Sequence, residues 1–221
     1  MRAEKTFPSP IATVDAVLLT LSGGVLSVGL IEREQPPFAG QAALPGGYVH
    51  VPEDATLEAA AARILRDKAR MECRFLEQLG TFSGAARDPR GWSLTVAYFA
   101  LVPEAELLAA AGALTLHPVE RLPPLAFDHA AIVAAAVARL RGKSSYSALP
   151  AFLLPPLFTL TELHAVYQLV LGTRLDPASF RRKVMDQGIV EAADARRIGA
   201  HRPAGLYRLR AGQALPFTHR I

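Results

Sequence analysis

Apolar and polar residues alternate with the period of β-strands over much of the first 143 residues, and segments with a helical period interrupt them. The first two strand-like stretches, 11–23 and 24–33, meet at Gly23-Gly24, which is typical of a hairpin turn. Three further strands and three helices are predicted in this region: strands 71–84, 93–103 and 114–122, and helices 56–70, 104–111 and 128–143. The pattern predicts an α/β/α sandwich, in which helices cover both faces of a mixed sheet.

The last third of the chain has a different pattern, with two short helices followed by two strands. The first helix, 158–172, carries apolar residues three and four positions apart. Asp176 and Pro177 are typical of the N-cap and first turn of the second helix. Strands 189–192 and 205–210 then flank a basic tip. This succession predicts a winged helix-turn-helix domain.

The segment 144–157 separates these two patterns. It contains three prolines and has no periodicity, which indicates a linker or an extended docking segment. We therefore predict a first domain at 1–143, a linker at 144–157 and a second domain at 158–221.

The composition favours a cytoplasmic protein. The longest apolar run, 130–138, is far shorter than the roughly 20 residues that cross a membrane. The first ten residues are charged and lack the apolar core of a secretion signal. Cys73 is the single cysteine, so no internal disulfide is possible. We expect no membrane contact.

Charge is distributed unevenly along the chain. Residues 1–143 have a net charge of −1, whereas residues 144–221 have a net charge of +5. The excess of cations in the last third indicates a polyanionic partner for that region.

Consecutive cations open the second helix of the predicted winged domain. Phe180 and Val184, four residues apart, are expected to face inward, which leaves Arg181, Arg182 and Lys183 outward. Such a helix can enter the major groove of double-stranded DNA, with side chains contacting guanine or phosphates. A basic cluster alone is more often a solvated face, but a basic wing beside it favours DNA binding.

The predicted wing supplies the second set of DNA-binding candidates. Arg196, Arg197 and Arg202 suit the adjacent backbone or minor groove. His201 has two equal interpretations, contact with DNA or bracing of the wing turn before Pro203.

The stretch 44–71, LPGGYVHVPEDATLEAAAARILRDKARM, resembles the Nudix box, a loop and helix that hold magnesium against a diphosphate. That chemistry needs carboxylates at helix positions i, i+3 and i+4, because this spacing places them on one face. Gly47 and Glu53 match the start of the box, and a two-residue insertion aligns Arg63 and Leu65 with its later positions. The three metal positions and the closing glycine are then Ile64, Asp67, Lys68 and Arg70.

One carboxylate of three therefore remains, and we expect a Nudix fold that has lost hydrolysis and holds no metal or cofactor. The alternative is an active pyrophosphatase acting on ADP-ribose. It requires an unconventional metal site built from Glu53, Glu58, Asp67 and Glu72.

A nucleotide diphosphate can still bind without a metal. Arg33 and Phe38 are expected at the mouth of the pocket, with the Gly46-Gly47 turn, Arg63 and Asp67 near the phosphates. Ala42 stands where many Nudix proteins have a stacking tryptophan, which argues against base stacking at that position.

Six stretches in this order are similar to the NrtR-type regulators of NAD metabolism: ALPGGYV, RDPRG, LAFDHA, FTLTELHAVY, FRRK and HRPAGLYR. The resemblance spans about 11–210. It implies a degenerate Nudix domain that senses ADP-ribose or a related NAD metabolite, joined to a DNA-binding winged helix. It also implies a homodimeric repressor of NAD biosynthesis or salvage genes that binds a palindromic operator.

Overall fold

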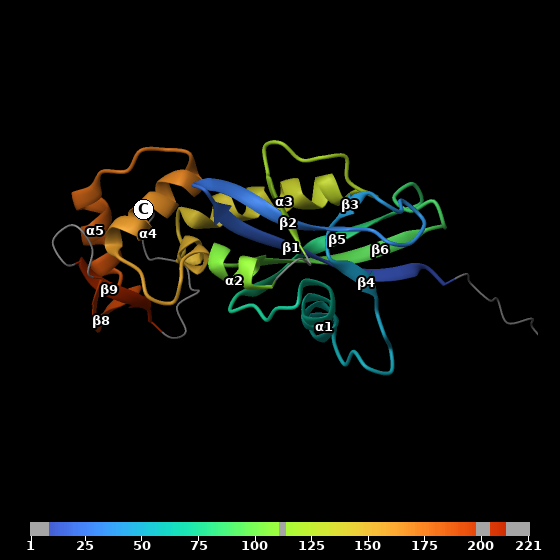
Figure 1. Cartoon of the computed structure of the whole chain (residues 1–221), viewed down its shortest axis with the longest axis horizontal. Coiled ribbons are helices and arrows are strands. Elements are labelled where there is room, and N and C mark those ends of the chain that lie inside the picture. Colours follow the sequence, from blue (N-terminus) through green and yellow to red (C-terminus); the bar gives the residue numbers. More distant parts are fainter. Residues whose placement is uncertain (1–8, 111–113, 198–203, 211–221) are drawn as a thin grey trace, which may run out of the picture.

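The computed structural model describes residues 9–110, 114–197 and 204–210. An elongated molecule results, with a large α/β domain at one end and a small domain at the other (Figure 1). The strands of the large domain are β1 (Ile11–Ser22), β2 (Val25–Glu32), β3 (Ala42–Ala43), β4 (Gly46–Tyr48), β5 (Leu76–Gly84), β6 (Ser93–Leu101) and β7 (Thr115–Pro118).

The sheet is mixed and has the order β3-β2-β1-β6-β5, with β4 paired to β1 and β7 paired to β2. Strands β1 and β6 run parallel, and the other described pairs of this sheet are antiparallel. The β1–β2 hairpin turns at Gly23 and Gly24, which both have positive φ, as predicted.

Strand β1 changes partner along its length. Its second half pairs with β2 from Leu18 onward, whereas Thr13 to Asp15 pair with β4. The chain between β2 and β4 forms a loop and then the short strand β3, which pairs with Ile31 and Glu32 on the other edge of β2.

Helices cover both faces of the sheet, which confirms the α/β/α sandwich (Figure 1). Helix α3 (His129–Ser144) covers the face that carries Val17 and Leu19, and α1 (Leu57–Ala69) covers the opposite face. Helix α2 (Glu104–Ala109) packs on the same face as α1. The opposite orientation of neighbouring β1 residues gives each helix layer its own apolar surface.

Of the strands predicted in the large domain, 71–84 and 114–122 differ most from the structure, in which both are shorter. Strand β5 begins at Leu76 instead of Met71, because its partner β6 ends at Leu101 and offers no backbone groups beyond that point. Strand β7 ends at Pro118, opposite Ser27, near the hairpin end of β2. A strand continues only while a neighbour accepts its hydrogen bonds.

The segment 144–157 is not an extended linker. Leu149–Leu153 form a short 3₁₀ helix, η1, with four buried residues. Leu149 and Leu153 join the core beneath α3, whereas Ala151 joins the core of the small domain. Its prolines break the helical period, which explains why periodicity alone missed it.

The small domain contains α4 (Leu160–Leu171), α5 (Pro177–Asp186), β8 (Val190–Arg197) and β9 (Ala204–Leu209). This succession confirms the predicted winged helix. Thr159 and Glu162 form a capping box at the start of α4, and the Asp176 side chain accepts a hydrogen bond from the Ser179 amide.

Two boundaries in this domain differ from the prediction. Phe158 lies outside α4 and pairs through its backbone with Tyr207, because the capping box places the helix start after Thr159. Strand β8 extends to Arg197, so Arg196 and Arg197 lie on a paired strand and not on the tip. Among the described residues, no helix is both long and apolar enough to cross a membrane.

Candidate functional site

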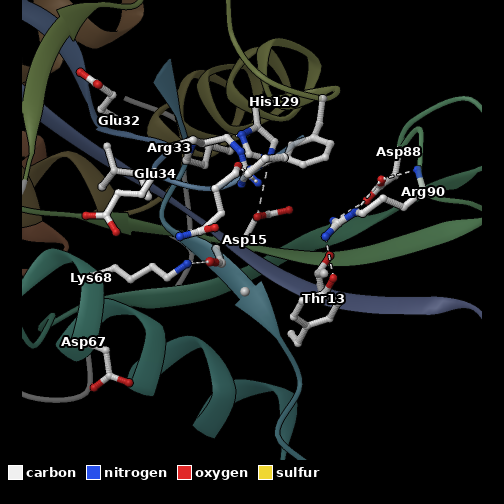
Figure 2. A pocket seen from close by; sticks show the side chains of 18 of the residues that line it. Thr13, Asp15, Glu32, Arg33, Glu34, Asp67, Lys68, Asp88, Arg90 and His129 are labelled. Carbon is white, nitrogen blue, oxygen red and sulfur yellow. Dashed lines mark hydrogen bonds and ion pairs between the residues drawn. The ribbon is translucent and has the colours of Figure 1, made fainter. Parts of the chain in front are cut away.

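A cavity of about 720 Å³ lies where β1 changes partner from β4 to β2, and residues of all three strands line it (Figure 2). This volume is typical of a small-molecule site. Side chains from six parts of the chain line the cavity, among them Thr13, Asp15, Glu32, Arg33, Glu34, Tyr48, Asp67, Lys68, Arg70, Arg87, Asp88, Arg90, Phe127 and His129.

The floor is a buried carboxylate beside a buried imidazole. His129 Nδ1 accepts a hydrogen bond from the Leu44 amide at 3.0 Å, so its proton is on Nε2, which lies 3.6 Å from Asp15 Oδ1. Burial lowers the pKa of His129, which favours the neutral ring. A side chain at Gly46 would overlap the Asp15 carboxylate, so this position requires glycine.

One wall carries two arginines that are fixed by aspartates. Arg87 donates to both carboxylate oxygens of Asp128 at 2.8 and 3.0 Å. Arg90 donates to Asp88 in the same two-bond manner at 2.7 and 3.0 Å, and this contact lowers the pKa of Asp88. Bidentate pairing fixes a guanidinium in position and direction.

Phe127 provides an aromatic surface between two cations. The guanidinium of Arg33 lies 4.7 Å from the centre of its ring, and that of Arg90 lies 5.9 Å away. Arg90 also donates to the Tyr48 hydroxyl at 2.6 Å. Ala42 lies in β3 and does not line the cavity, where Phe127 and Tyr48 supply the aromatic surface.

Backbone strain is concentrated at this site. Phe38, Arg70 and Phe127 are the described non-glycine residues with positive φ, at 65°, 54° and 54°. Arg70 and Phe127 line the cavity, and Phe38 packs its ring on Phe127 at 4.9 Å. Such conformations are typical of ligand-binding sites, where the surrounding structure holds them.

The metal positions of the box hold no carboxylate cluster. Ile64 is 1% exposed and packs with Val14 and Val96 inside the core. Lys68 Nζ donates to the Gly46 carbonyl, and Asp67 lies apart at the rim (Figure 2). Burial, followed by the charge of Arg33, lowers the pKa of Lys68. Within the described ranges, no three His, Cys, Asp or Glu side chains could hold a metal together.

The predicted ligand residues separate into two groups. Arg33, Gly46, Gly47 and Asp67 line the cavity. Phe38 packs behind Phe127, and Arg63 lies outside the lining, where its guanidinium binds Asp54 and the Tyr48 carbonyl. The hydrogen bond from Arg63 lowers the pKa of Asp54 to about 2. Arg63 therefore braces the loop before α1 in this structure.

Residue types and spacing did not reveal Asp15, Arg87, Arg90, Phe127 and His129 as cavity residues. The stretches RDPRG and LAFDHA contain four of them, and both belong to the resemblance to NrtR-type regulators, which assigned no cavity role to these residues. Long-range packing brings them together with β1, which local patterns do not report.

The predicted DNA-binding residues that the structure describes lie on α5 and β8, at the far end of the molecule from the cavity (Figure 1). Arg181, Arg182 and Lys183 are on the exposed side of α5, opposite the buried Phe180 and Val184. This arrangement matches the prediction of an outward basic face on the second helix.

The wing arginines differ from one another. Arg196 is exposed on β8, whereas Arg197 forms an ion pair with Glu162 of the α4 capping box. His201 and Arg202 lie outside the described residues, so their predicted roles stay predictions.

Comparisons with known proteins identify both ends of the molecule. Residues 150–209 match the NrtR DNA-binding winged helix domain. The chain is 42% identical over 208 residues to the ADPR responsive transcriptional repressor NtrR of Acinetobacter baylyi, covering 91% of this chain and 83% of that protein.

Two solved structures of Shewanella oneidensis NrtR are similar to this one. The complex with a 27mer DNA has a TM-score of 0.89 at 36% identity and covers 95% of this chain and 99% of that chain. The NUDIX domain complexed with ADP ribose has a TM-score of 0.56 at 37% identity and covers 61% of this chain and 90% of that chain.

Proposed function

This chain belongs to the NrtR family of transcriptional repressors, and we propose that it represses genes of NAD biosynthesis or salvage in response to ADP-ribose. The observation that carries the proposal is the cavity, in which fixed arginines and aromatic rings meet in a chain that also has a DNA-binding winged helix. The cavity receives the effector, and the winged helix holds the operator.

The cavity has the chemistry that ADP-ribose requires. Arg33 and Arg90 offer guanidiniums for the diphosphate, and Phe127 and Tyr48 offer rings on which adenine can stack. The buried Asp15 carboxylate can accept a hydrogen bond from a ribose hydroxyl. The relative crystallised with ADP ribose supports this choice of ligand.

We propose that the Nudix-like domain is a sensor without hydrolase activity. Ile64 lies in the core and Lys68 holds the Gly46 carbonyl, so two of the three metal positions cannot supply a carboxylate. Turnover of ADP-ribose at about 1 per second, the lower end of ordinary enzyme rates, would contradict this and favour the pyrophosphatase alternative.

On the DNA side, α5 is the proposed reading helix. One winged helix reads only a few base pairs, so specific binding calls for two copies and a palindromic operator with half-sites about one helical turn, or a multiple of it, apart. We propose a homodimer formed mainly through the Nudix-like domain.

The test is DNA binding by the full-length protein, measured as fluorescence anisotropy with DNA from upstream of its own gene. ADP-ribose should change the affinity for DNA by about 5- to 150-fold, the usual range of coupling between two sites. NAD and nicotinamide mononucleotide are tested in the same way as alternative effectors. Specific binding that no NAD-related nucleotide alters would refute the sensor role. A protein that binds ADP-ribose but no DNA would refute the repressor role.

A further inference from the structure

Lys68 occupies a distinctive place in the cavity. It belongs to the last turn of α1, and its side chain reaches across to β4, where Nζ donates to the Gly46 carbonyl (Figure 2). A Cβ placed on Gly47 would lie 3.8 Å from the same nitrogen. The ammonium therefore lies between α1 and the Gly46-Gly47 turn, the two parts of the stretch that resembles the Nudix box.

The residues present do not fit magnesium. This ion demands near-octahedral oxygen coordination, and it takes carboxylates and carbonyls at short distances. Here Ile64 is buried among apolar side chains, and the Gly46 carbonyl already accepts a bond from a cation. Asp67, the remaining carboxylate, is 55% exposed and lies within 4.0 Å of both Arg63 and Arg66.

A carbonyl oxygen of the backbone holds the ammonium, and the carboxylates of Asp15 and Glu34 attract it. Burial and the nearby charge of Arg33 outweigh this attraction and lower the pKa of Lys68, so the cavity favours an anionic ligand beside the ammonium. An ammonium has three donor hydrogens, and Gly46 uses one of them. Two donors are then available for phosphate oxygens, and the carbonyl contact fixes the direction in which they point.

We propose that Lys68 replaces the divalent metal of the Nudix box, so that this sensor binds the diphosphate of its nucleotide effector without any metal ion. The proposal rests on the proposed function, because it concerns the same cavity and the same ligand class. In an active box the carboxylates bind a metal cation, whereas here the Lys68 ammonium supplies the positive charge.

The test is calorimetry of the full-length protein with ADP-ribose, in EDTA and in millimolar magnesium. The affinity should be the same in both buffers within about twofold. Lys68→Met should lower the affinity in EDTA by about tenfold or more, because a charge-assisted bond to phosphate is lost. Lys68→Gln keeps a donor for the Gly46 carbonyl but removes the charge, and it should lose as much.

Arg66→Met is the matched control. Arg66 lies on the same helix, is 62% exposed and does not line the cavity, so its loss should leave the affinity unchanged. Thermal melting of each variant establishes that it is folded, and Lys68→Gln covers the case in which methionine disturbs the fold.

The outcomes separate this inference from the proposed function. Binding that requires magnesium in the wild-type protein would overturn the role of Lys68 while leaving ADP-ribose as the effector. Equal losses of affinity for Arg66→Met and Lys68→Met would also overturn it, because the loss of any positive charge on α1 would then explain both. Absence of ADP-ribose binding in either buffer, with DNA binding intact, would overturn the proposed effector and this inference with it.

Discussion

The arginines of the cavity and those of α5 differ in their hydrogen-bond partners. In the cavity, Arg87 and Arg90 are each held by an aspartate through two hydrogen bonds. On α5, Arg181 and Arg182 are exposed and make no hydrogen bond or ion pair with another described residue. A small ligand with one diphosphate requires cations that point in fixed directions, whereas the affinity for a long polyanion depends mainly on the number of positive charges.

The charge balance of the two halves reflects this difference. Acidic residues balance the arginines of the first 143 residues, whose net charge is −1, whereas the last 78 residues carry +5. The sensor is therefore expected to bind its effector with little dependence on salt, whereas DNA binding should weaken steeply as salt rises.

The largest expected effect comes from removing the exposed cations of α5. Arg181→Ala combined with Arg182→Ala should weaken operator binding by roughly 100-fold or more, since each base-reading arginine contributes about 1–3 kcal/mol. Anisotropy at several salt concentrations measures the loss. Arg66→Ala, which removes an exposed cation from the sensor, is the control. Unchanged affinity in a folded double variant would make the C-terminal domain a docking module.

For the paired arginines of the cavity, the test is to remove the aspartate partner. Asp88→Asn removes the charge that holds Arg90, so ADP-ribose affinity should fall by roughly tenfold, equivalent to about 1.5 kcal/mol for a charged hydrogen bond. DNA affinity without effector should not change. Glu53→Gln, which removes a 64% exposed carboxylate away from the cavity, should leave calorimetric binding intact. An unaffected Asp88→Asn variant would mean that Arg90 does not contact the ligand.

The wing contains one arginine of each kind, which sharpens the comparison within a single strand. Arg196 is exposed, whereas Arg197 is paired with Glu162. Arg196→Ala should therefore flatten the dependence of log affinity on log salt by roughly one unit, and Arg197→Ala should flatten it less. Equal slopes for the two variants would indicate that the Glu162 pair opens when DNA binds.

The smallest effect concerns the cavity floor. Burial lowers the pKa of His129 below its usual value, so the unfolded chain binds the proton more readily than the folded one. The stability from neutral His129 is present above about pH 6.5 and is lost as pH falls below it, by up to about 1.4 kcal/mol per pH unit. Urea unfolding at pH 7.5 and 5.5 measures this loss, and His129→Gln should reduce it. An equal loss in that variant would assign the pH dependence to other groups.

Local signals in the sequence predicted most of the elements. Gly23-Gly24 indicated the first hairpin, Asp176 and Pro177 marked the start of α5, and Phe180 and Val184 identified its inward face. Each of these features depends on residues close together in the chain, which is why a reading of spacing and residue type succeeds there.

The cavity depended on contacts that spacing does not report. Arg87 is fixed by Asp128, 41 residues away, and His129 accepts from Leu44, 85 residues away. Arg63 has the right residue type for a phosphate contact, but Asp54 engages it. Only the packing of distant loops decides which arginine reaches a ligand and which one braces a loop.

The short η1 segment has a consequence for engineering. Its residues belong to two cores at once, with Leu149 and Leu153 beneath α3 and Ala151 in the winged helix. Val166 and Val170 of α4 also enter the core beneath α3. A chimaera that joins this Nudix-like domain to the winged helix of another regulator must therefore keep side chains that pack on both sides of η1. Either domain can be exchanged only if η1, which is buried in the cores of both domains, is exchanged or matched with it.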